Sequence, residues 1–395
     1  MTRLGIFMSH PIQYQIGLLK NIARQRDVDL LVNYYWDFGV DETYDLEFGK
    51  KIKWDVPLFE GYKYQFIKNY AKKKSTSFFG CINPGVVLPI LRNEFDVVLV
   101  FGWALFSNWL VIMTALMSKT PILLCAESPF SHEATKMGFC GKVRRIVLGT
   151  LFSKVSGFLY IGNQNLLFYE SFGIASEKLF FAPYAVDNTR HIEYQKTSVE
   201  DDCISSTVKI LFVGKLIEKK RPMDLLKAFH GLQSALHEST TELWFVGNGV
   251  QQLDLEDYIA KYGVKGVTFW GFRNQTELPR FYDDADICVL PSGYGETWGL
   301  VVNEAMCYGK PIVVSDLVGC GSDLVTDNNG YIFPCKDVEK LEDVLKKLVS
   351  DESLRKKFGQ ESFKIIQGYS QEISAYNIAS AAIKVASIAR SKDNA

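Results

Sequence analysis

Short apolar runs, rich in β-branched and aromatic residues, alternate with segments of helical pattern along the second half of the chain. The strand-like runs lie at 209–214, 242–247, 267–271, 287–292, 311–316 and 331–334, and the helical patterns between and after them lie at 222–235, 251–262, 276–284, 299–308 and 337–349. Strands that are apolar throughout are typical of a parallel sheet covered by helices on both faces. The pattern therefore predicts a doubly wound α/β domain over residues 208–370.

The first half of the chain shows the same alternation with more interruptions. Its strand-like runs lie at 4–9, 28–36, 97–102, 121–127, 157–162 and 179–186, and helical patterns lie at 140–156 and 163–172. Residues 37–95 are rich in aromatics and lysine, and we interpret them as an insertion with loops. A second doubly wound domain is expected here.

These patterns predict the domain boundaries. We expect an N-terminal domain over 1–187, a polar linker over 188–207, a C-terminal domain over 208–370 and a C-terminal helix within 371–395 that packs back on the N-terminal domain. The expected fold class is α/β, with two doubly wound domains facing a central cleft. Ligands of such sheets bind beyond the carboxyl ends of the strands, so the loops after the strands are the candidate binding segments.

Composition and charge narrow the class of protein. With 395 residues and 47% apolar side chains, the chain can build two cores. Its net charge is −1 and it has no long basic tail, which argues against a nucleic-acid partner. Eight scattered cysteines lack the close spacing of zinc or redox motifs, and the opening residues do not have the pattern of a signal peptide. We therefore expect a cytoplasmic protein.

One uncharged stretch, 97–118, is long enough to cross a bilayer as a helix. Its first part is a β-branched run ending in Gly102, and its second part opens with the capping residues Ser107 and Asn108. The run at 121–127 follows. We interpret the stretch as part of a buried strand–helix–strand unit rather than as a membrane span.

A cluster of cations follows the strand-like run at 209–214. Lys215, Lys219, Lys220 and Arg221 precede Pro222, which suits the first position of a helix. Cations beside the positive end of a helix repel one another, and an anion such as a diphosphate would relieve that repulsion. The ordinary alternative is a solvated surface loop.

Two carboxylates stand eight residues apart in the apolar segment "GETWGLVVNEAMCYGKP". Glu296 falls in the loop before the helix expected at 299–308, and Glu304 falls inside that helix. Eight helical residues rise about 12 Å, which exceeds the carboxyl separation of glycosidases. We expect the two to hold different parts of one elongated ligand. The alternative for Glu304 is a capping or salt-bridged helix residue.

The segment "PSGYGETWGLVVNEAMCYGKPIVVSDLVGCGSDLV" resembles the signature of retaining family-four glycosyltransferases, also called glycosyl transferases group 1. "LFVGKLIEKKRPMDLLKAF" and "APYAVD" resemble two further segments of that family, and "SHPIQYQIGLLKNIA" with "WDVPLFEGYKY" resemble the opening of a polysaccharide-assembling branch. The resemblance covers most of the chain. It implies a GT-B fold with two Rossmann-like domains and a nucleotide-sugar donor.

By matched position, the resemblance implies a role for each residue of the donor site. Glu296 would hold hydroxyls of the donor sugar, and Glu304 would hold the ribose. Lys220, with Lys215 where the family more often has Arg, would neutralise the departing diphosphate as a point charge. The remaining implied donor-binding residues are Gly214, Arg221, Gly247, Asn248, Gly249, Phe272, Arg273, Thr297, Trp298, Gly299 and Leu300.

No metal or cofactor is expected, because lysines and a helix terminus would stabilise the leaving group. The Asp-Ala-Asp string at 284–286 formally matches a metal motif, but its place between a helix and a buried strand favours a structural role. "FVGNGVQQ" offers only half of a dinucleotide fingerprint. The expected co-substrate is a UDP- or GDP-sugar.

The resemblance implies that the first domain binds the acceptor, a glycan or a lipid-linked molecule. Here the chain departs from the family, because it lacks a glycine pair after the first strand and has Glu127 where many members have a His. His10 and Glu127 are both candidates to position the acceptor hydroxyl; for His10 the alternative is a helix-entry residue before Pro11. The leaving phosphate itself would accept the hydroxyl proton.

Charge is distributed unevenly between the two halves. Residues 1–199 hold 22 Lys/Arg against 17 Asp/Glu, including Lys-Lys-Lys at 72–74 and Lys-Val-Arg-Arg at 142–145. This bias fits peripheral contact with an anionic membrane, although a solvated helix face would look the same. Two other functions stay open: a nucleotide-sugar epimerase of the same architecture, and a non-catalytic nucleotide-binding partner of another transferase.

Overall fold

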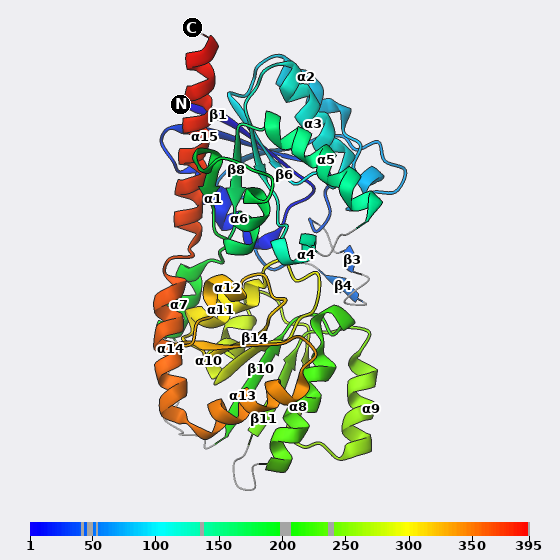
Figure 1. Cartoon of the computed structure of the whole chain (residues 1–395), viewed down its shortest axis with the longest axis vertical. Coiled ribbons are helices and arrows are strands. Elements are labelled where there is room, and N and C mark those ends of the chain that lie inside the picture. Colours follow the sequence, from blue (N-terminus) through cyan, green and yellow to red (C-terminus); the bar gives the residue numbers. More distant parts are fainter. Residues whose placement is uncertain are drawn as a thin grey trace. The chain divides into compact units, whose positions relative to one another are not determined.

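The computed structural model describes residues 1–40, 43–45, 50–52, 54–134, 138–197, 207–235 and 241–393. These residues divide into two compact units (Figure 1). The first unit comprises 1–43, 57–184 and 371–395, and the second comprises 44–56 and 185–370. Each has its own parallel sheet and its own hydrophobic core.

The first unit is built on a seven-stranded sheet in the order β5-β2-β1-β6-β7-β8-β9. All its strand pairs are parallel. The strands are β1 (Thr2–Met8), β2 (Val28–Tyr34), β5 (Lys63–Phe66), β6 (Val97–Phe101), β7 (Ile122–Cys125), β8 (Gly157–Tyr160) and β9 (Leu179–Phe181). The first four residues of the central strand β6 are fully buried, as expected where helices cover both faces.

The helices of the first unit are α1 (Ile16–Ala23), α2 (Val87–Leu91), α3 (Phe106–Met117), α4 (Phe130–Ala134), α5 (Phe139–Lys154), α6 (Asn163–Glu170) and α15 (Gln371–Asp393). The long helix α15 packs against α1 and against strands β1, β6, β8 and β9 (Figure 1). Gly17 of α1 makes this contact possible, since a Cβ there would lie 1.9 Å from Oε1 of Gln371. The last residues of the chain therefore belong to the first unit.

The second unit is built on a six-stranded parallel sheet in the order β12-β11-β10-β13-β14-β15. Its strands are β10 (Val208–Val213), β11 (Thr241–Val246), β12 (Val267–Gly271), β13 (Ile287–Leu290), β14 (Ile312–Ser315) and β15 (Gly330–Phe333). Its helices are α7 (Asn188–Thr197), α8 (Pro222–Ala235), α9 (Gln252–Tyr262), α10 (Leu278–Asp284), α11 (Leu300–Cys307), α12 (Gly321–Leu324), α13 (Val338–Ser350) and α14 (Glu352–Ile366). The prediction of two doubly wound α/β sheets is confirmed.

Capping side chains set where α13 and α14 begin. The carboxylate of Asp337 accepts the backbone N–H of Lys340 at 2.9 Å, and that of Asp351 accepts the N–H of Leu354 at 2.8 Å. Each bond satisfies a backbone donor that has no partner within the helix. Asp351 is also the single residue that connects α13 to α14.

The interpretation of residues 37–95 as an insertion with loops is partly wrong. Strand β5 lies within this segment and pairs in parallel with β2 at the edge of the sheet. The short strands β3 (Thr43–Asp45) and β4 (Lys50–Ile52) form a separate small sheet, and residues 44–56 belong to the second unit. Part of the segment, 41–42, 46–49 and 53, lies outside the described residues.

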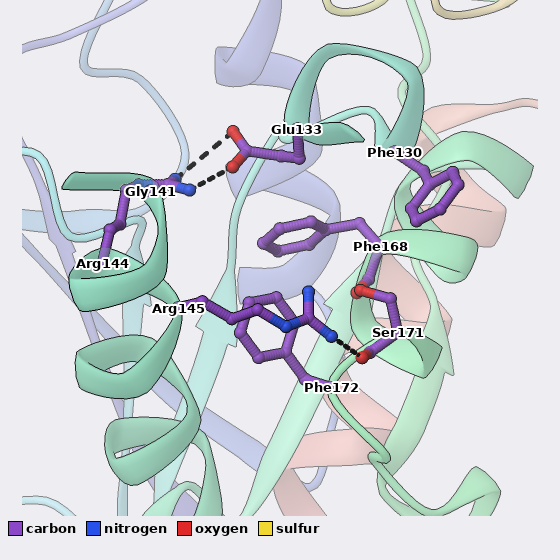
Figure 2. Close-up of a pocket in the computed structure, with 8 residues that line it drawn as sticks. All are labelled: Phe130, Glu133, Gly141, Arg144, Arg145, Phe168, Ser171 and Phe172. Carbon is purple, nitrogen blue, oxygen red and sulfur yellow. Dashed lines mark hydrogen bonds and ion pairs between the residues drawn. The ribbon is translucent and has the colours of Figure 1, made fainter. Parts of the chain in front are cut away.

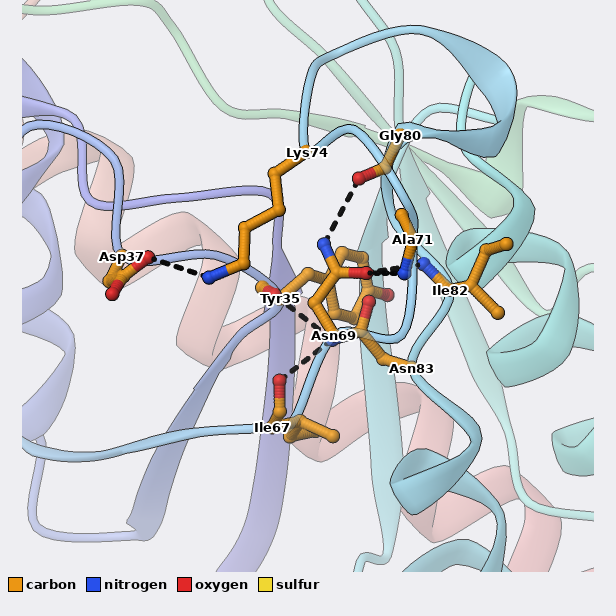
Figure 3. Close-up of polar contacts among 9 residues, drawn as sticks. All are labelled: Tyr35, Asp37, Ile67, Asn69, Ala71, Lys74, Gly80, Ile82 and Asn83. Carbon is orange, nitrogen blue, oxygen red and sulfur yellow. Dashed lines mark hydrogen bonds and ion pairs between the residues drawn. The ribbon is translucent and has the colours of Figure 1, made fainter.

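Two asparagines fix the loop between β5 and α2 (Figure 3). Asn69 accepts the N–H groups of Ala71 and Ile82 at 2.9 and 3.0 Å, and it donates to the carbonyl of Gly80 at 3.0 Å. Asn83 donates to the carbonyls of Tyr35 and Ile67 at 2.9 and 2.7 Å. The two side chains thus form hydrogen bonds with backbone groups of the loop, as a neighbouring strand would do within a sheet.

The structure also bears on the uncharged stretch at 97–118 and on the linker expected at 188–207. The uncharged stretch 97–118 forms β6 and α3, and no helix among the described residues is both long and apolar enough to cross a bilayer. Residues 188–197 of the expected linker instead form α7, which packs on α10 and α11 in the second unit. The rest of the expected linker, 198–206, is outside the described residues.

Candidate functional site

The loops after β10 and β11 meet through their glycines. The N–H of Leu216 bonds to the carbonyl of Asn248 at 2.9 Å. A Cβ on Gly247 would lie 1.9 Å from the carbonyl oxygen of Gly214, and one on Gly249 would lie 2.3 Å from that of Leu216. Gly247 also has φ +141°, a conformation that favours glycine. These contacts bring together four of the expected donor-binding residues.

A buried polar atom lies in this group of loops. Oδ1 of Asn248 is shielded from solvent and has no hydrogen-bond partner among the residues that the structure describes. Buried polar atoms are normally satisfied, so an unpaired acceptor in a loop at the carboxyl edge of a parallel sheet is a position for a ligand donor.

Lys220 and Glu296 form an ion pair between the loop after β10 and the loop after β13. Their side chains are only 17% and 9% exposed. Burial on its own would raise the pKa of Glu296, but the charges of Lys220 and Lys219 outweigh it and the pKa is lowered. The Glu296 side chain is therefore an ionised carboxylate at neutral pH.

Backbone contacts hold these two loops in place. The N–H of Gly293 bonds to the carbonyl of Lys219 at 2.7 Å. The backbone carbonyl of Glu296 accepts a second contact, from the N–H of Gly319 at 3.1 Å. Because a Cβ on Gly319 would lie 2.0 Å from the carbonyl oxygen of Thr297, that close packing requires glycine. The position of Glu296 is thus fixed from both sides.

Two of the cations that follow β10 have carboxylate partners in the protein. Arg221 pairs with Asp224 three residues on, with Nε 2.5 Å from Oδ2, and Lys220 pairs with Glu296. The protein thus supplies a carboxylate to each of these two cations. Arg221 has φ +52°, which turns the chain sharply into α8 at Pro222. Pro222 opens the helix as predicted.

Glu304 lies within α11, and its hydrogen-bond partner is a tyrosine, whereas Glu296 pairs with a lysine. It accepts a hydrogen bond of 2.5 Å from the hydroxyl of Tyr282 on α10. Burial raises the pKa of Glu304 to about 7, against the lowering effects of the Tyr282 hydrogen bond and the charge of Arg190. Glu304 thus titrates close to neutral pH, unlike Glu296.

Aromatic side chains surround Glu304. Tyr282 and Tyr308 stack with ring centroids 5.8 Å apart, and the hydroxyl of Tyr308 lies 3.1 Å from Nδ1 of His191 on α7. Burial lowers the pKa of His191 to about 3, so its imidazole is neutral. Sequence reasoning missed Tyr282, Tyr308 and His191. Their aromatic type alone suggests only core packing, since the contacts join helices far apart in sequence.

The remaining expected donor-binding residues lie around the start of α11 and after β12. Gly299 precedes the helix with φ +107°, and Leu300 is its first residue. The indole of Trp298 donates to Oδ1 of Asn303 at 2.9 Å, which leaves the ring buried. Arg273 donates to the carbonyl of Trp270 and pairs with Glu277 at 3.0 Å, beside Phe272.

The expected acceptor residues lie in the first unit. His10 follows β1 and Glu127 follows β7, strands that flank β6 in the sheet. Nδ1 of His10 lies 2.9 Å from the hydroxyl of Ser9, and its ring meets Phe38 edge-on at 5.3 Å. Burial lowers the pKa of His10 to about 4, so the imidazole is neutral. Glu127 is half-buried, and its charge adds to burial in raising the pKa of Tyr14.

The last feature of the site is the placement of side chains that could bind a metal ion. Within the described residues there is no group of three or more His, Cys, Asp or Glu side chains placed to hold a metal ion. In the Asp-Ala-Asp string, Asp286 accepts the backbone N–H of Lys209 at 2.8 Å, which is a structural contact.

A family model and several known proteins are similar in sequence to parts of this chain. Residues 204–365 match the family model for glycosyl transferases group 1. An uncharacterized glycosyltransferase of Methanocaldococcus jannaschii is 36% identical over 127 residues, which cover 32% of each chain. The glycogen synthase of Mycobacterium tuberculosis is 35% identical over 144 residues, 36% of this chain and 34% of that protein. The matched region thus spans about a third of the length of these relatives.

Solved structures match the whole fold. Anabaena HepE in complex with UDP has a TM-score of 0.71 at 16% identity, covering 96% of this chain and 99% of that one. The lipopolysaccharide outer core galactosyltransferase WaaB in its apo form has a TM-score of 0.68 at 14% identity, covering 97% and 99%. This likeness confirms the predicted GT-B architecture.

Proposed function

We propose that the chain is a glycosyltransferase of the glycosyl transferases group 1 family, whose model matches residues 204–365. It would move a sugar from a nucleotide-diphosphate sugar to a hydroxyl of a glycan or lipid-linked acceptor, with retention of the anomeric configuration and without a metal ion. Synthesis of a surface polysaccharide or glycoconjugate is the proposed setting.

The buried pair of Lys220 and Glu296 carries the proposal. It lies in loops after β10 and β13, at the carboxyl edge of the second sheet, where ligands of such sheets bind. An ammonium group has three N–H donors, so Lys220 can bond a phosphate oxygen while still contacting Glu296. A carboxylate accepts several hydrogen bonds, so Glu296 can also receive sugar hydroxyls.

The proposed reaction follows from these contacts. The bond between the anomeric carbon and the diphosphate oxygen breaks as the acceptor oxygen bonds to that carbon. Lys220 and Lys215 stabilise the charge on the departing diphosphate, with the N-terminus of α11 at Gly299 and Leu300. The departing phosphate takes the acceptor proton. His10 and Glu127, at strand ends of the first unit, would position the acceptor hydroxyl.

Glu304 is the proposed ribose-binding residue. Its bond to Tyr282 uses Oε2, which leaves Oε1 to accept a ribose hydroxyl. Asn248, with an unpaired buried Oδ1, would receive a donor from the nucleotide base, together with Gly247, Gly249, Phe272 and Arg273 around it. The HepE structures hold UDP, and UDP with glucose, and on that likeness we propose UDP rather than GDP as the carrier.

We also propose where in the cell the chain works. The chain would work in the cytoplasm and contact the inner face of the membrane peripherally, where a lipid-linked acceptor is available. Neither the epimerase nor the non-catalytic alternative has a specific observation in its favour.

Thermal unfolding with added ligands tests the proposal. UDP and UDP-sugars should raise the unfolding midpoint of the wild-type protein, because a ligand of the native state stabilises it. The same shift should be lost in Glu304→Ala. Nuclear magnetic resonance of the product should show the donor's anomeric configuration, and activity should persist in a metal chelator. Isomerised donor formed without any acceptor would instead indicate an epimerase.

A further inference from the structure

Residues 44–56 belong to the second unit, although the chain on both sides of them belongs to the first. They lie in the connection between β2 and β5, which are neighbouring parallel strands of the first sheet. Such a pair needs only a crossover over its own sheet. The fold of the first unit therefore does not require this segment to pack on the second unit, and we looked for a role in the site there.

The end of this segment is attached to the loop between β12 and α10. The carboxylate of Asp55 accepts the backbone N–H of Thr276 at 3.0 Å and also accepts its hydroxyl. The ring of Trp54 lies against that of Phe272, with centroids 6.3 Å apart and planes inclined at 55°. Hydrogen bonds to an ionised carboxylate are stronger than neutral ones, so Asp55 holds Trp54 at this loop.

The same loop borders the unpaired acceptor of the candidate site. The carbonyl of Gly271 accepts the N–H of Gly247 at 2.9 Å. A Cβ on Gly271 would lie 3.3 Å from Oδ1 of Asn248, the buried oxygen without a hydrogen-bond partner in the described part of the chain. Phe272, the partner of Trp54, is the next residue. The aromatic pair thus directly follows the residue that meets the unpaired oxygen.

These groups match the chemistry of a nucleotide base. A base has a flat aromatic face and N–H donors at its edge. Aromatic side chains bind bases by stacking on that face, and this contact tolerates any base. Trp54 and Phe272 are both half-buried, so part of each ring lies at the surface. The amide oxygen of Asn248 can accept an N–H from the edge of a stacked base.

We propose that Trp54 is a binding residue of the nucleotide-base subsite. The base of a nucleoside diphosphate stacks on Trp54 beside Phe272, and its edge donates to Oδ1 of Asn248. Asp55 is a positioning residue, because it acts through Thr276 and Trp54. The inference rests on the proposed function for the identity of the ligand, and it adds to the donor site a residue from the first half of the chain.

Calorimetric titration with UDP tests the stacking contact. Trp54→Leu keeps an apolar contact with Phe272 but has no aromatic face, so the Kd for UDP should rise about tenfold. Trp54→Phe keeps an aromatic face and should stay within about threefold of wild type. If Trp54→Leu bound UDP as tightly as wild type, Trp54 would serve packing alone and the proposal would be wrong.

Inorganic diphosphate separates base binding from general damage to the site. It has no base, so it should raise the unfolding midpoint equally in wild type and in Trp54→Leu. Equal losses for diphosphate and UDP would overturn the assigned role.

The positioning role of Asp55 has its own variant. Asp55→Ala should weaken UDP binding about threefold and leave the diphosphate shift unchanged, because it removes the bonds to Thr276. The matched control is Glu60→Ala, since the carboxylate of Glu60 is exposed and pairs with Lys20 within the first unit. Equal UDP affinities in these two variants would refute the positioning role.

A pocket in the first unit is another place where aromatic rings and cations meet (Figure 2). It has a volume of about 80 Å³ and lies between α4, α5 and α6. There Arg145 lies over the ring of Phe172 at 4.5 Å and donates to the carbonyl of Ser171. Because these groups already contact one another, Arg145→Gln should leave UDP affinity unchanged. Loss of UDP binding in Arg145→Gln but not in Trp54→Leu would place the base in the first unit and refute the proposal.

The wild-type titration separates this inference from the proposed function. If wild type binds UDP and Trp54→Leu binds it equally, only the role of Trp54 fails. If wild type binds neither UDP nor GDP, the proposed function fails as well.

Discussion

The hydroxyl of Tyr282 donates a 2.5 Å hydrogen bond to Oε2 of Glu304, and both side chains are buried. The bond joins α10 to α11, so the carboxyl that would hold the ribose is oriented by a neighbouring helix. Tyr282 is therefore a positioning residue in the proposed site. Its ring is itself held by stacking on Tyr308.

Tyr282→Phe should weaken donor binding more than it slows turnover. Without the phenol, a buried carboxyl loses its donor, which costs about 1–3 kcal/mol of stability and raises the pKa of Glu304 further. We expect the KM for the nucleotide sugar to rise about tenfold with kcat changed less. Steady-state kinetics measure both, and Tyr258→Phe, which loses a 3.2 Å contact to His230, is the control. Equal effects of the two changes would contradict the positioning role.

The raised pKa of Glu304 predicts a pH dependence of stability. Its carboxyl titrates near 4.5 in the unfolded chain and at about 7 in the folded one, so the folded state binds the proton more tightly. The stabilisation is full below about pH 4.5 and is lost as the pH rises to about 7. The total is roughly 3 kcal/mol.

His10 and His191 act in the opposite direction over an overlapping range. Burial lowers the pKa of each, to about 4 and about 3, so each adds stability as the pH rises toward 6.5. The effect of Glu304 must therefore be measured as a difference. Urea unfolding of wild type and Glu304→Gln between pH 4.5 and 8 should show the variant gaining relative stability as the pH rises. A constant difference would refute the raised pKa.

The pair of Lys220 and Glu296 predicts a large catalytic effect. Lys220→Ala and Glu296→Ala should each lower kcat by about 10² to 10³, because each removes a preorganised charge contact. Circular dichroism should show the fold intact. Lys227→Ala, an exposed cation on α8, is the control and should be close to wild type. A loss of less than about fivefold in both site variants would count against the assigned site.

Most strands of both sheets could be predicted from sequence, because a parallel strand covered on both faces is largely apolar and that signal is local. Strand β5 escaped prediction because "KYQF" lies at an edge and is exposed at all four positions. Its place in the sheet depends on pairing with β2, which lies some thirty residues earlier. Residues 44–56 joined the second unit through contacts that no local pattern encodes.

In the candidate site, too, some features could be predicted from local sequence and others depend on the fold. The motif containing Glu296 and Glu304 was visible in the sequence, but their partners were not all predictable. The pair of Arg221 and Asp224 has the spacing of neighbours on a helix and could have been foreseen. Lys220 and Glu296 are 76 residues apart, and Tyr282 and Glu304 are 22 apart, so only the fold brings each pair together.

Gly247 gives a prediction about the shape of the site. Gly247→Ala would place a Cβ 1.9 Å from the carbonyl oxygen of Gly214, in a backbone conformation with φ +141°. Both the clash and the strained conformation should force the loops after β10 and β11 apart. We expect a loss of more than about 2 kcal/mol in the free energy of unfolding and loss of the UDP-induced midpoint shift.

The matched control for this change is Gly263→Ala. Gly263 also has positive φ, +67°, at the end of α9, but its Cβ would meet nothing within 4 Å. Its cost should be about 1 kcal/mol of backbone strain, with the UDP-induced shift retained. If both variants lost the same stability and both still bound UDP, the close approach of Gly247 to Gly214 would have no part in forming the nucleotide site.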